Sequence, residues 1–304
     1  MRPAISTEVF LPHRLTTGLL DALQGSGATA IEIFAARHHF DYTDRSTVRG
    51  IAAWFRDTAL LPTLHQPLYA DAQWSRHVAP NLNLIDPERS RRILAMDEVK
   101  RALESAEQIP FASLVLHLGG RNERWDNRAL ENSLTAIEHV KAFAAPLGVQ
   151  LLLENLQNEV TTPEHLLEIL HVGHFEAVGI CLDIGHAHLA EPVSILDSNG
   201  ERRTRSGIDH AFDLLGRRVT ELHIHDNNGA RDEHLWPGSI EASSPAPHGM
   251  DWTAVQVHAA ALPAEIPGVL EISHDLHETP ESVTHKASAY FAEEARRAEA
   301  LYEV

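Results

Sequence analysis

The sequence predicts an α/β protein that folds as a single (β/α)8 TIM barrel over residues 1–304. Short runs rich in valine, isoleucine and leucine alternate with longer stretches of helical periodicity, which is typical of repeated βα units around a parallel sheet. Eight such pairs can be counted along the chain. The hydrophobic content of 43% over 304 residues is enough for the large core of such a barrel.

The predicted strands are short apolar runs bounded by turn or helix signals. Each one is followed by a helical stretch, so every strand can lie parallel to the next. We expect the strands at residues 4–10, 30–35, 62–67, 113–119, 150–156, 178–187, 220–226 and 268–273.

The predicted helices have recognisable ends. The stretch 86–109 opens on Asp86 and Pro87, an N-cap followed by a proline in the first turn. Thr162 and Thr279 each precede Pro-Glu and are expected to cap helices, and Gly148 ends a helix before a strand. One face of the 86–109 helix should pack on the barrel through Ile93, Met96, Val99, Leu103 and Ala106.

Nothing in the sequence divides the chain into two domains. It contains no internal repeat, low-complexity tract or linker rich in proline and glycine. Residues 190–206 and 237–250 are expected to be loop insertions on the ligand-bearing side of the barrel. They are candidate lids or substrate walls, although plain solvated loops fit the same pattern.

Composition limits the classes of function. A net charge of −18 disfavours a general nucleic-acid or anionic-membrane surface, because such surfaces depend on lysine and arginine. Only three lysines occur and all lie in helical stretches, so a Schiff-base mechanism lacks a nucleophile at a strand end. Cys181, the only cysteine, is expected in the core. The chain start and hydropathy predict a cytoplasmic protein without a membrane span.

Several predicted strands end on a side chain that can bind a metal ion. A carboxylate within an apolar strand, as in the Leu-Leu-Leu-Glu run of Glu154, is costly to bury unless it is paired or bound to a cation. Because a parallel barrel brings all its strand ends to one rim, distant residues can meet there. The six residues are His65, His117, Glu154, Asp183, His223 and Glu271.

A second signal is the density of ligands after the seventh predicted strand. His223 and His225 share one strand face, and Asp232 and His234 follow in a turn-rich loop that can fold back over the rim. A single histidine of this kind is more often a hydrogen-bonded structural residue. As a group they indicate a metal site, and His186, three residues after Asp183, adds to it.

With these residues the chain resembles the xylose isomerase-like TIM barrel superfamily, which includes sugar-phosphate isomerases and epimerases and the endonuclease IV type of abasic-site nucleases (AP endonuclease family 2). For the isomerases, the resemblance implies one divalent metal ion bound by Glu154, Asp183, His223 and Glu271. For the nucleases, it implies a three-zinc cluster whose further ligands would be His65, His117, His186, Asp232 and His234.

Two enzyme functions and one binding function remain open. The first is an isomerase or epimerase of a small sugar, sugar phosphate or polyol derivative, in which Glu154 and Glu271 move the proton and a divalent metal stabilises the enediolate. The alternative is a multi-zinc phosphodiester hydrolase acting on abasic DNA or a small phosphodiester. A barrel that binds metal and a sugar-like ligand without catalysis is the third.

The cofactor and partners follow from these hypotheses. We expect one to three divalent ions, zinc, manganese or magnesium, and a small carbohydrate substrate. Nucleic acid is disfavoured by the charge, and a homodimer through the outer helices is plausible for this architecture. Arg37, His225 and Arg231 are candidate substrate-binding residues because they lie at or after the ends of predicted strands.

Overall fold

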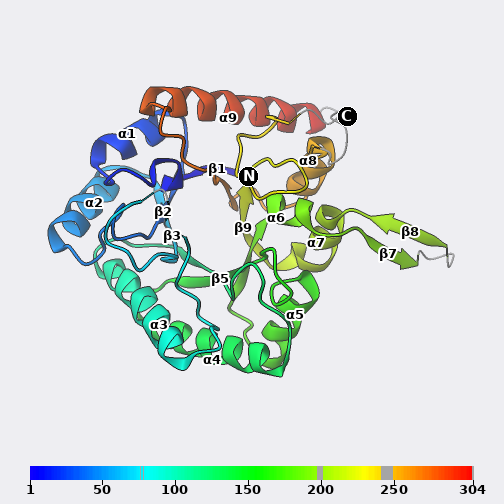
Figure 1. Ribbon diagram of the computed structural model, residues 1–304. Coiled ribbons are helices and arrows are strands. Elements are labelled where there is room, and N and C mark those ends of the chain that lie inside the picture. The colour runs from blue at the N-terminus through cyan, green and yellow to red at the C-terminus, as the bar shows by residue number, and fades with distance from the viewer. Residues whose placement is uncertain (76, 78, 197–200, 241–248, 303–304) are drawn as a thin grey trace.

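Eight parallel strands close into a barrel at the centre of the protein, with helices around the outside (Figure 1). The computed structural model describes residues 1–302 except 76, 78, 197–200 and 241–248. Each strand pairs with its neighbours in chain order, and the last pairs with the first, which confirms the predicted barrel. The strands are β1 (Arg2–Ser6), β2 (Ala30–Phe34), β3 (Leu61–His65), β4 (Ser113–Leu116), β5 (Gln150–Glu154), β6 (Gly179–Asp183), β9 (Val219–Ile224) and β10 (Pro267–Leu270).

The outer layer is formed by helices that follow the strands in turn. Their inner faces and the outer faces of the strands make one large apolar core. The helices are α1 (Thr17–Gly25), α2 (Arg45–Asp57), α3 (Arg89–Glu104), α4 (Asn127–Ala144), α5 (Pro163–Val172), α6 (Ile184–Leu189), α7 (Gly207–Leu215), α8 (Trp252–Ala260) and α9 (Pro280–Tyr302). Short 3-10 turns lie at Thr7–Phe10, Ser105–Glu107, Ala145–Leu147 and Gly216–Arg218.

The inside of the barrel is filled by a second, separate set of side chains. Ala4, Ala30 and Val269 form one small apolar cluster and are paired in register across β1, β2 and β10. Cys181 belongs to another such cluster, with neighbours on β4 and β5, so its predicted place in the core is confirmed. Because successive residues on a strand point to opposite faces, these small clusters identify which positions of each strand point inward.

Two predicted strands turn into helical structure before their expected last residues. β1 ends at Ser6, whose side chain accepts a hydrogen bond from the backbone N–H of Glu8 and starts a 3-10 turn. β6 ends at Asp183, whose carboxylate accepts from the backbone N–H of His186 and caps α6. His186 therefore lies on a short helix and not on the predicted strand 178–187.

The third predicted helix begins later than its sequence suggests. Asp86 Oδ1 accepts from the backbone N–H of Glu88 at 2.8 Å in a local turn, so α3 starts only at Arg89. Ile93, expected on the packed face, is 51% exposed. Val99 and Leu103 are buried as predicted. The caps at Thr162 and Thr279 are confirmed by their hydrogen bonds to backbone N–H groups.

One of the two predicted loop insertions contains regular structure. Residues Val193–Leu196 (β7) and Arg202–Arg205 (β8) form an antiparallel hairpin that projects from one side of the barrel (Figure 1). Alternating β-branched residues, Val193 and Ile195, favour this strand pair. Much of the other insertion, 237–250, lies outside the described residues. Within the described part of the chain, no helix combines the length and apolar character needed to cross a bilayer.

Candidate metal centre

The metal-ligand candidates occupy the inward positions of the strands at one end of the barrel. His65 is paired in register with Val115, and Glu154 with Cys181, both members of an interior cluster. Asp183 is paired with His223. Period-two alternation then places His117 and Glu271, two residues beyond inward-facing positions, on the same side. The strand register therefore brings together residues separated by more than a hundred positions.

The first ligand group, called here the primary centre, consists of Glu154, Asp183, His223 and Glu271. One donor atom from each residue lies within 4.8 Å of the others. The Nδ1 atom of His223 is 3.1 Å from a Glu271 oxygen, 3.7 Å from Glu154 and 4.0 Å from Asp183. All four side chains are buried.

The donor atoms of the primary centre fit a divalent cation. Four polar atoms of these side chains are buried without a hydrogen bond among the described residues: Glu154 Oε1, Asp183 Oδ2, His223 Nδ1 and Glu271 Oε2. Two ion-pair contacts remain, between His223 Nδ1 and Glu271 Oε2 at 3.1 Å and between Glu154 Oε1 and His186 Nδ1 at 3.3 Å. Buried polar atoms without partners are uncommon because their desolvation is not compensated. Three carboxylates and one imidazole are a donor set that magnesium, manganese or zinc can accept. A cation between these side chains would compensate their buried negative charge.

Electrostatics around the primary centre show how strongly the carboxylates depend on positive charge. Burial raises the pKa of Glu154, but the charges of His117 and His223 more than offset this and hold it well below its usual value. Burial likewise opposes ionisation of Glu271, while His223 lowers its pKa. Without a bound cation the histidines supply the compensating charge.

A second group of ligands adjoins the primary centre. His65 Nε2 lies 3.0 Å from His117 Nε2, and His117 Nε2 is 2.8 Å from Glu154 Oε2. Burial lowers the pKa of His65, but a hydrogen bond to Glu154 and nearby carboxylate charges raise it to about 9. Glu154 therefore lies between this pair and the primary centre, where its carboxylate can bridge two cations.

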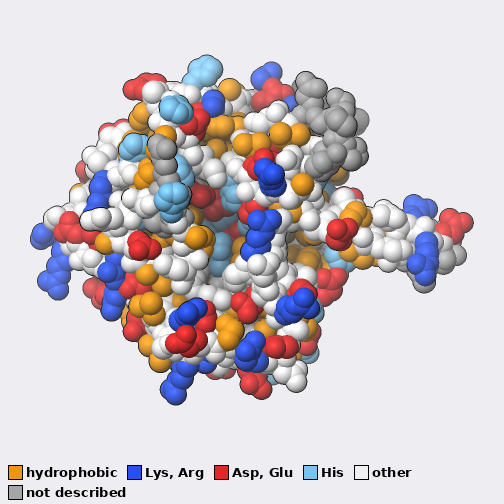
Figure 2. All heavy atoms as spheres, in the orientation of Figure 1, with side chains coloured by type: hydrophobic (Ala, Val, Ile, Leu, Met, Phe, Trp, Pro, Cys, Tyr) orange, Lys and Arg blue, Asp and Glu red, His pale blue; other side chains and the backbone are white. Residues whose placement is uncertain are grey.

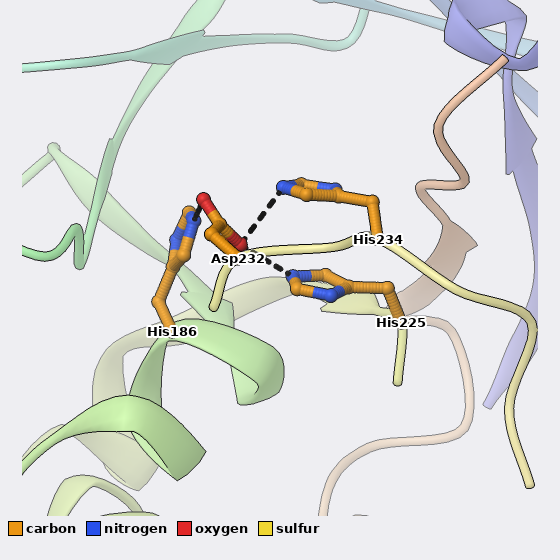
Figure 3. Close-up of side chains that lie close together, drawn as sticks. All are labelled: His186, His225, Asp232 and His234. Carbon is orange, nitrogen blue, oxygen red and sulfur yellow. Dashed lines mark hydrogen bonds and ion pairs between the residues drawn. The ribbon is translucent and has the colours of Figure 1, made fainter. Parts of the chain in front are cut away.

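A third group, called here the loop centre, lies where the segment after β9 folds back over the rim (Figure 3). Asp232 sits between the rings, 3.1 Å from His186 Nε2 and 3.2 Å from His234 Nε2. His225 stacks on His234 with ring centres 3.8 Å apart, and its Nε2 is 3.9 Å from Asp232 and 3.1 Å from Asp183. His225, predicted to bind substrate, is buried beside these residues, where it is a candidate fourth metal ligand.

The loop that carries Asp232 and His234 is held by its own hydrogen bonds. Asp226 and Leu235 pair through two backbone hydrogen bonds of 2.8 and 2.9 Å, which fold the segment into a closed turn. His234 adopts a positive φ of 47°, a conformation that is uncommon for a residue with a β-carbon. Backbone strain of this kind is concentrated at binding sites.

A cavity of about 750 Å³, called here the central cavity, opens above the ligands. Its wall includes His65, His117, Glu154, Asp232 and Glu271. In Figure 2 the hollow at the centre of the barrel face exposes acidic and histidine side chains. The volume is within the range of small-molecule sites.

A second cavity of about 760 Å³ lies beside the first and is bounded partly by the start of the β7–β8 hairpin. His186, Leu156, Gln157 and Arg121 line both cavities. Residues 190 and 193 of the predicted insertion therefore do form a wall next to the site.

Two predicted substrate-binding residues lie elsewhere. The guanidinium of Arg37 binds the buried carboxylate of Glu98, at 3.0 Å from Nε, and is not among the residues lining the central cavity. Its positive charge is needed there because Glu98 is only 2% exposed. Arg231 is exposed at the tip of the loop after β9, also outside the lining of the central cavity.

Glu8 is a cavity residue that the sequence interpretation missed. It lines the central cavity from the 3-10 turn after β1, near His234 and Glu271. Burial, together with the charge of Glu271, raises the pKa of Glu8 to about 8. A carboxyl group in this position can donate a hydrogen bond to a substrate oxygen at neutral pH.

Comparison with known proteins identifies the family. The family model described as xylose isomerase-like TIM barrel matches residues 20–300, so the chain belongs to this family. An uncharacterised protein of Methanocaldococcus jannaschii is 26% identical over 243 residues, covering 77% of this chain and 74% of its own length. A probable endonuclease 4 of Haloquadratum walsbyi is 25% identical over 217 residues, covering 66% of this chain and 70% of its own length.

Solved structures share the fold over nearly the whole chain. A D-tagatose 3-epimerase-like protein superposes with a TM-score of 0.73 at 21% identity, covering 99% of this chain and 100% of its own. The IolI protein with a bound zinc atom has a TM-score of 0.72 at 17% identity, covering 98% and 99%. The chain thus shares its barrel fold with these solved structures.

Proposed function

We propose that this protein is a divalent-metal-dependent isomerase or epimerase of a small sugar, sugar phosphate or polyol derivative. The observation that carries the proposal is the buried cluster of donor atoms in the primary centre, two residues of which, Glu154 and Glu271, line the central cavity. The structural likeness to a D-tagatose 3-epimerase-like protein and to the IolI protein with a bound zinc atom supports it. A bound divalent cation would supply stabilisation of negative charge on adjacent substrate oxygens.

Glu154 and Glu271 are the residues proposed to move the proton. Both carboxylates line the cavity, and both approach the same imidazole atom, His223 Nδ1, from β5 and from the end of β10. Each carboxylate has two oxygens, so one can face the cation while the other faces a substrate carbon. One glutamate can then remove the proton from carbon and the other return it.

Proton exchange tests this assignment. The protein, loaded with manganese, is incubated in D2O with a panel of ketoses and ketose phosphates, and deuterium at the substrate carbon is measured by NMR. Glu271→Gln should abolish exchange while substrate binding is partly retained, and Glu138→Gln, an exposed carboxylate on α4, should leave exchange unchanged. Exchange at the wild-type rate in Glu271→Gln would refute the role of this glutamate.

The loop centre favours a second candidate function, hydrolysis of a phosphodiester at a multi-metal site. Together with His65 and His117, it provides ligands for up to three ions, and one relative is named a probable endonuclease. The loop centre, however, offers four protein donors, His186, His225, Asp232 and His234. Four protein ligands fill the shell of a tetrahedral zinc ion, whereas a hydrolytic ion keeps an open position.

The two candidates differ in a measurable way. A hydrolase predicts close to three zinc ions per chain, cleavage of abasic-site DNA and a steep loss of binding with salt. The isomerase requires only the ion of the primary centre, and any ion at the loop centre would be structural. We therefore place the isomerase first, in keeping with the net charge of −18.

A further inference from the structure

The two nitrogens of His223 face different surroundings. Nδ1 points into the primary centre, 3.1 Å from Glu271 Oε2. Nε2 points the other way, into the barrel interior, where Glu32 Oε2 lies at 3.2 Å and Glu221 Oε1 at 3.6 Å. His223 and both of these glutamates are almost completely buried. The ring thus connects the proposed metal centre with a pair of carboxylates beneath it.

The chemistry of imidazole fixes which nitrogen carries the proton. A neutral histidine that binds a cation through one nitrogen keeps its N–H on the other, and this N–H needs an acceptor when it is buried. With Nδ1 as the ligand atom, the N–H is on Nε2. The Glu32 carboxylate is the acceptor within hydrogen-bond distance.

Glu32 has no other evident task in the described part of the chain. It lies in the middle of β2, in register with Ser6 and Thr63, and does not line the central cavity. Its inward neighbours on the strand, Ala30 and Phe34, are apolar. The other oxygen of Glu32, Oε1, has no hydrogen-bond partner among the described residues. A carboxylate is costly in such a place unless its charge is used.

Glu221 provides an internal comparison. It is as deeply buried as Glu32 and faces the same imidazole nitrogen. Its Oε2 accepts a hydrogen bond from Ser113 Oγ at 3.2 Å, and its closest approach to His223 Nε2, 3.6 Å, exceeds hydrogen-bond distance. Removing the charge of Glu221 therefore changes the same environment without removing the acceptor of the histidine.

We propose that Glu32 is a positioning residue of the primary centre: its carboxylate accepts the Nε2–H of His223, fixes the ring, and holds Nδ1 free as the ligand atom. This inference rests on the proposed metal centre. Glu32 does not touch the substrate. It acts through His223 by setting its tautomer and increasing the electron density that the ring donates to the cation.

Metal affinity and tautomer state test the proposal. Zinc affinity of the full-length protein is measured by competition with a chromophoric chelator for wild type, Glu32→Gln and Glu221→Gln. Loss of such an outer carboxylate lowers metal affinity about 10- to 100-fold, so we expect Glu32→Gln to fall in this range. We expect Glu221→Gln to stay close to wild type. Circular dichroism of the metal-free variants checks that both are folded.

A measurement on the wild-type protein alone keeps the proposal falsifiable if a variant does not fold. Long-range 1H–15N correlation spectra of the zinc-loaded protein should show His223 protonated on Nε2. A proton on Nδ1, or equal affinities for wild type and Glu32→Gln, would overturn the role of Glu32. If the wild-type protein binds no zinc at all, the proposed metal centre itself is wrong, which is a different outcome.

Discussion

Binding of a divalent cation at the primary centre should release a proton from His223. Burial lowers the pKa of this imidazole, but Cys181 and the surrounding carboxylates more than offset this and raise it well above 6.5. In the metal-free protein His223 is therefore protonated at neutral pH. Because a histidine binds a cation only in its neutral form, the ion must displace this proton.

The size of the effect follows from the number of protons displaced. Each released proton makes the apparent metal affinity rise tenfold per pH unit, or about 1.4 kcal/mol. As long as the pH lies below the raised pKa of His223, each pH unit should strengthen binding at the primary centre about tenfold. Binding at the neighbouring groups should add to this slope, because the pKa of His65 is raised to about 9 and that of His234 to about 10.

Isothermal titration calorimetry measures the release directly. Titrating manganese in two buffers of different ionisation enthalpy gives the number of protons from the difference in observed heat. The control variant His139→Gln changes an exposed histidine on α4 and should release the same number as wild type. Tight binding with a pH-independent affinity and no proton release would refute the ligand role of His223.

Two further predictions concern stability and the loop centre. Burial lowers the pKa of His39 to about 4 from 6.5, so the folded state excludes a proton that the unfolded chain takes up as the pH falls through this window. Acidification should cost about 3 kcal/mol through this residue, and His39→Gln should lose that part of the pH dependence in urea unfolding. In Gly185→Ala the new methyl group would collide with the His225 ring. The variant should weaken zinc binding at the loop centre and leave the primary centre loaded, which zinc stoichiometry by mass spectrometry would show. Unchanged binding at both centres would contradict the role of His225.

The barrel and most of the ligand positions could be predicted because strand alternation and barrel closure together determine where the strand ends meet. Alternation along each strand identifies one inward face, and chain closure brings the strand ends to one rim. Glu154 and Glu271 could be recognised because burying a carboxylate among leucines and valines is costly unless it is paired or bound to a cation. The structure places both where this reasoning expects, at the floor of the central cavity.

Glu32 could have been found by the same reasoning. It lies in Ala-Ile-Glu-Ile-Phe, an apolar strand like those of Glu154 and Glu271, but it is in the middle of the strand and not at its end. The ligands predicted from the barrel strands are those at strand ends, which meet at the rim. A buried carboxylate one layer below the rim can orient a metal ligand by accepting its hydrogen bond. Strand alternation alone indicates that such a carboxylate points into the barrel.

Other features depend on contacts that leave no periodic signal. Glu8 enters the cavity because a four-residue 3-10 turn follows β1, and so short a turn has no hydrophobic repeat. Arg37 was expected near substrate because it follows a strand, yet the partner that fixes it, Glu98, is 61 residues away on α3. The sequence placed His225 in the histidine-rich group after the seventh predicted strand, but its position against His234 depends on the loop after β9, which folds back and stacks the two rings.

The most direct test of the metal centre is its occupancy. Crystals of the protein grown with manganese, with diffraction recorded at the manganese absorption edge, would locate each ion by its anomalous signal. We expect a peak within coordination distance of Glu154, Asp183, His223 and Glu271. Full ordering of these four side chains with no anomalous peak between them would show that they do not form a metal centre.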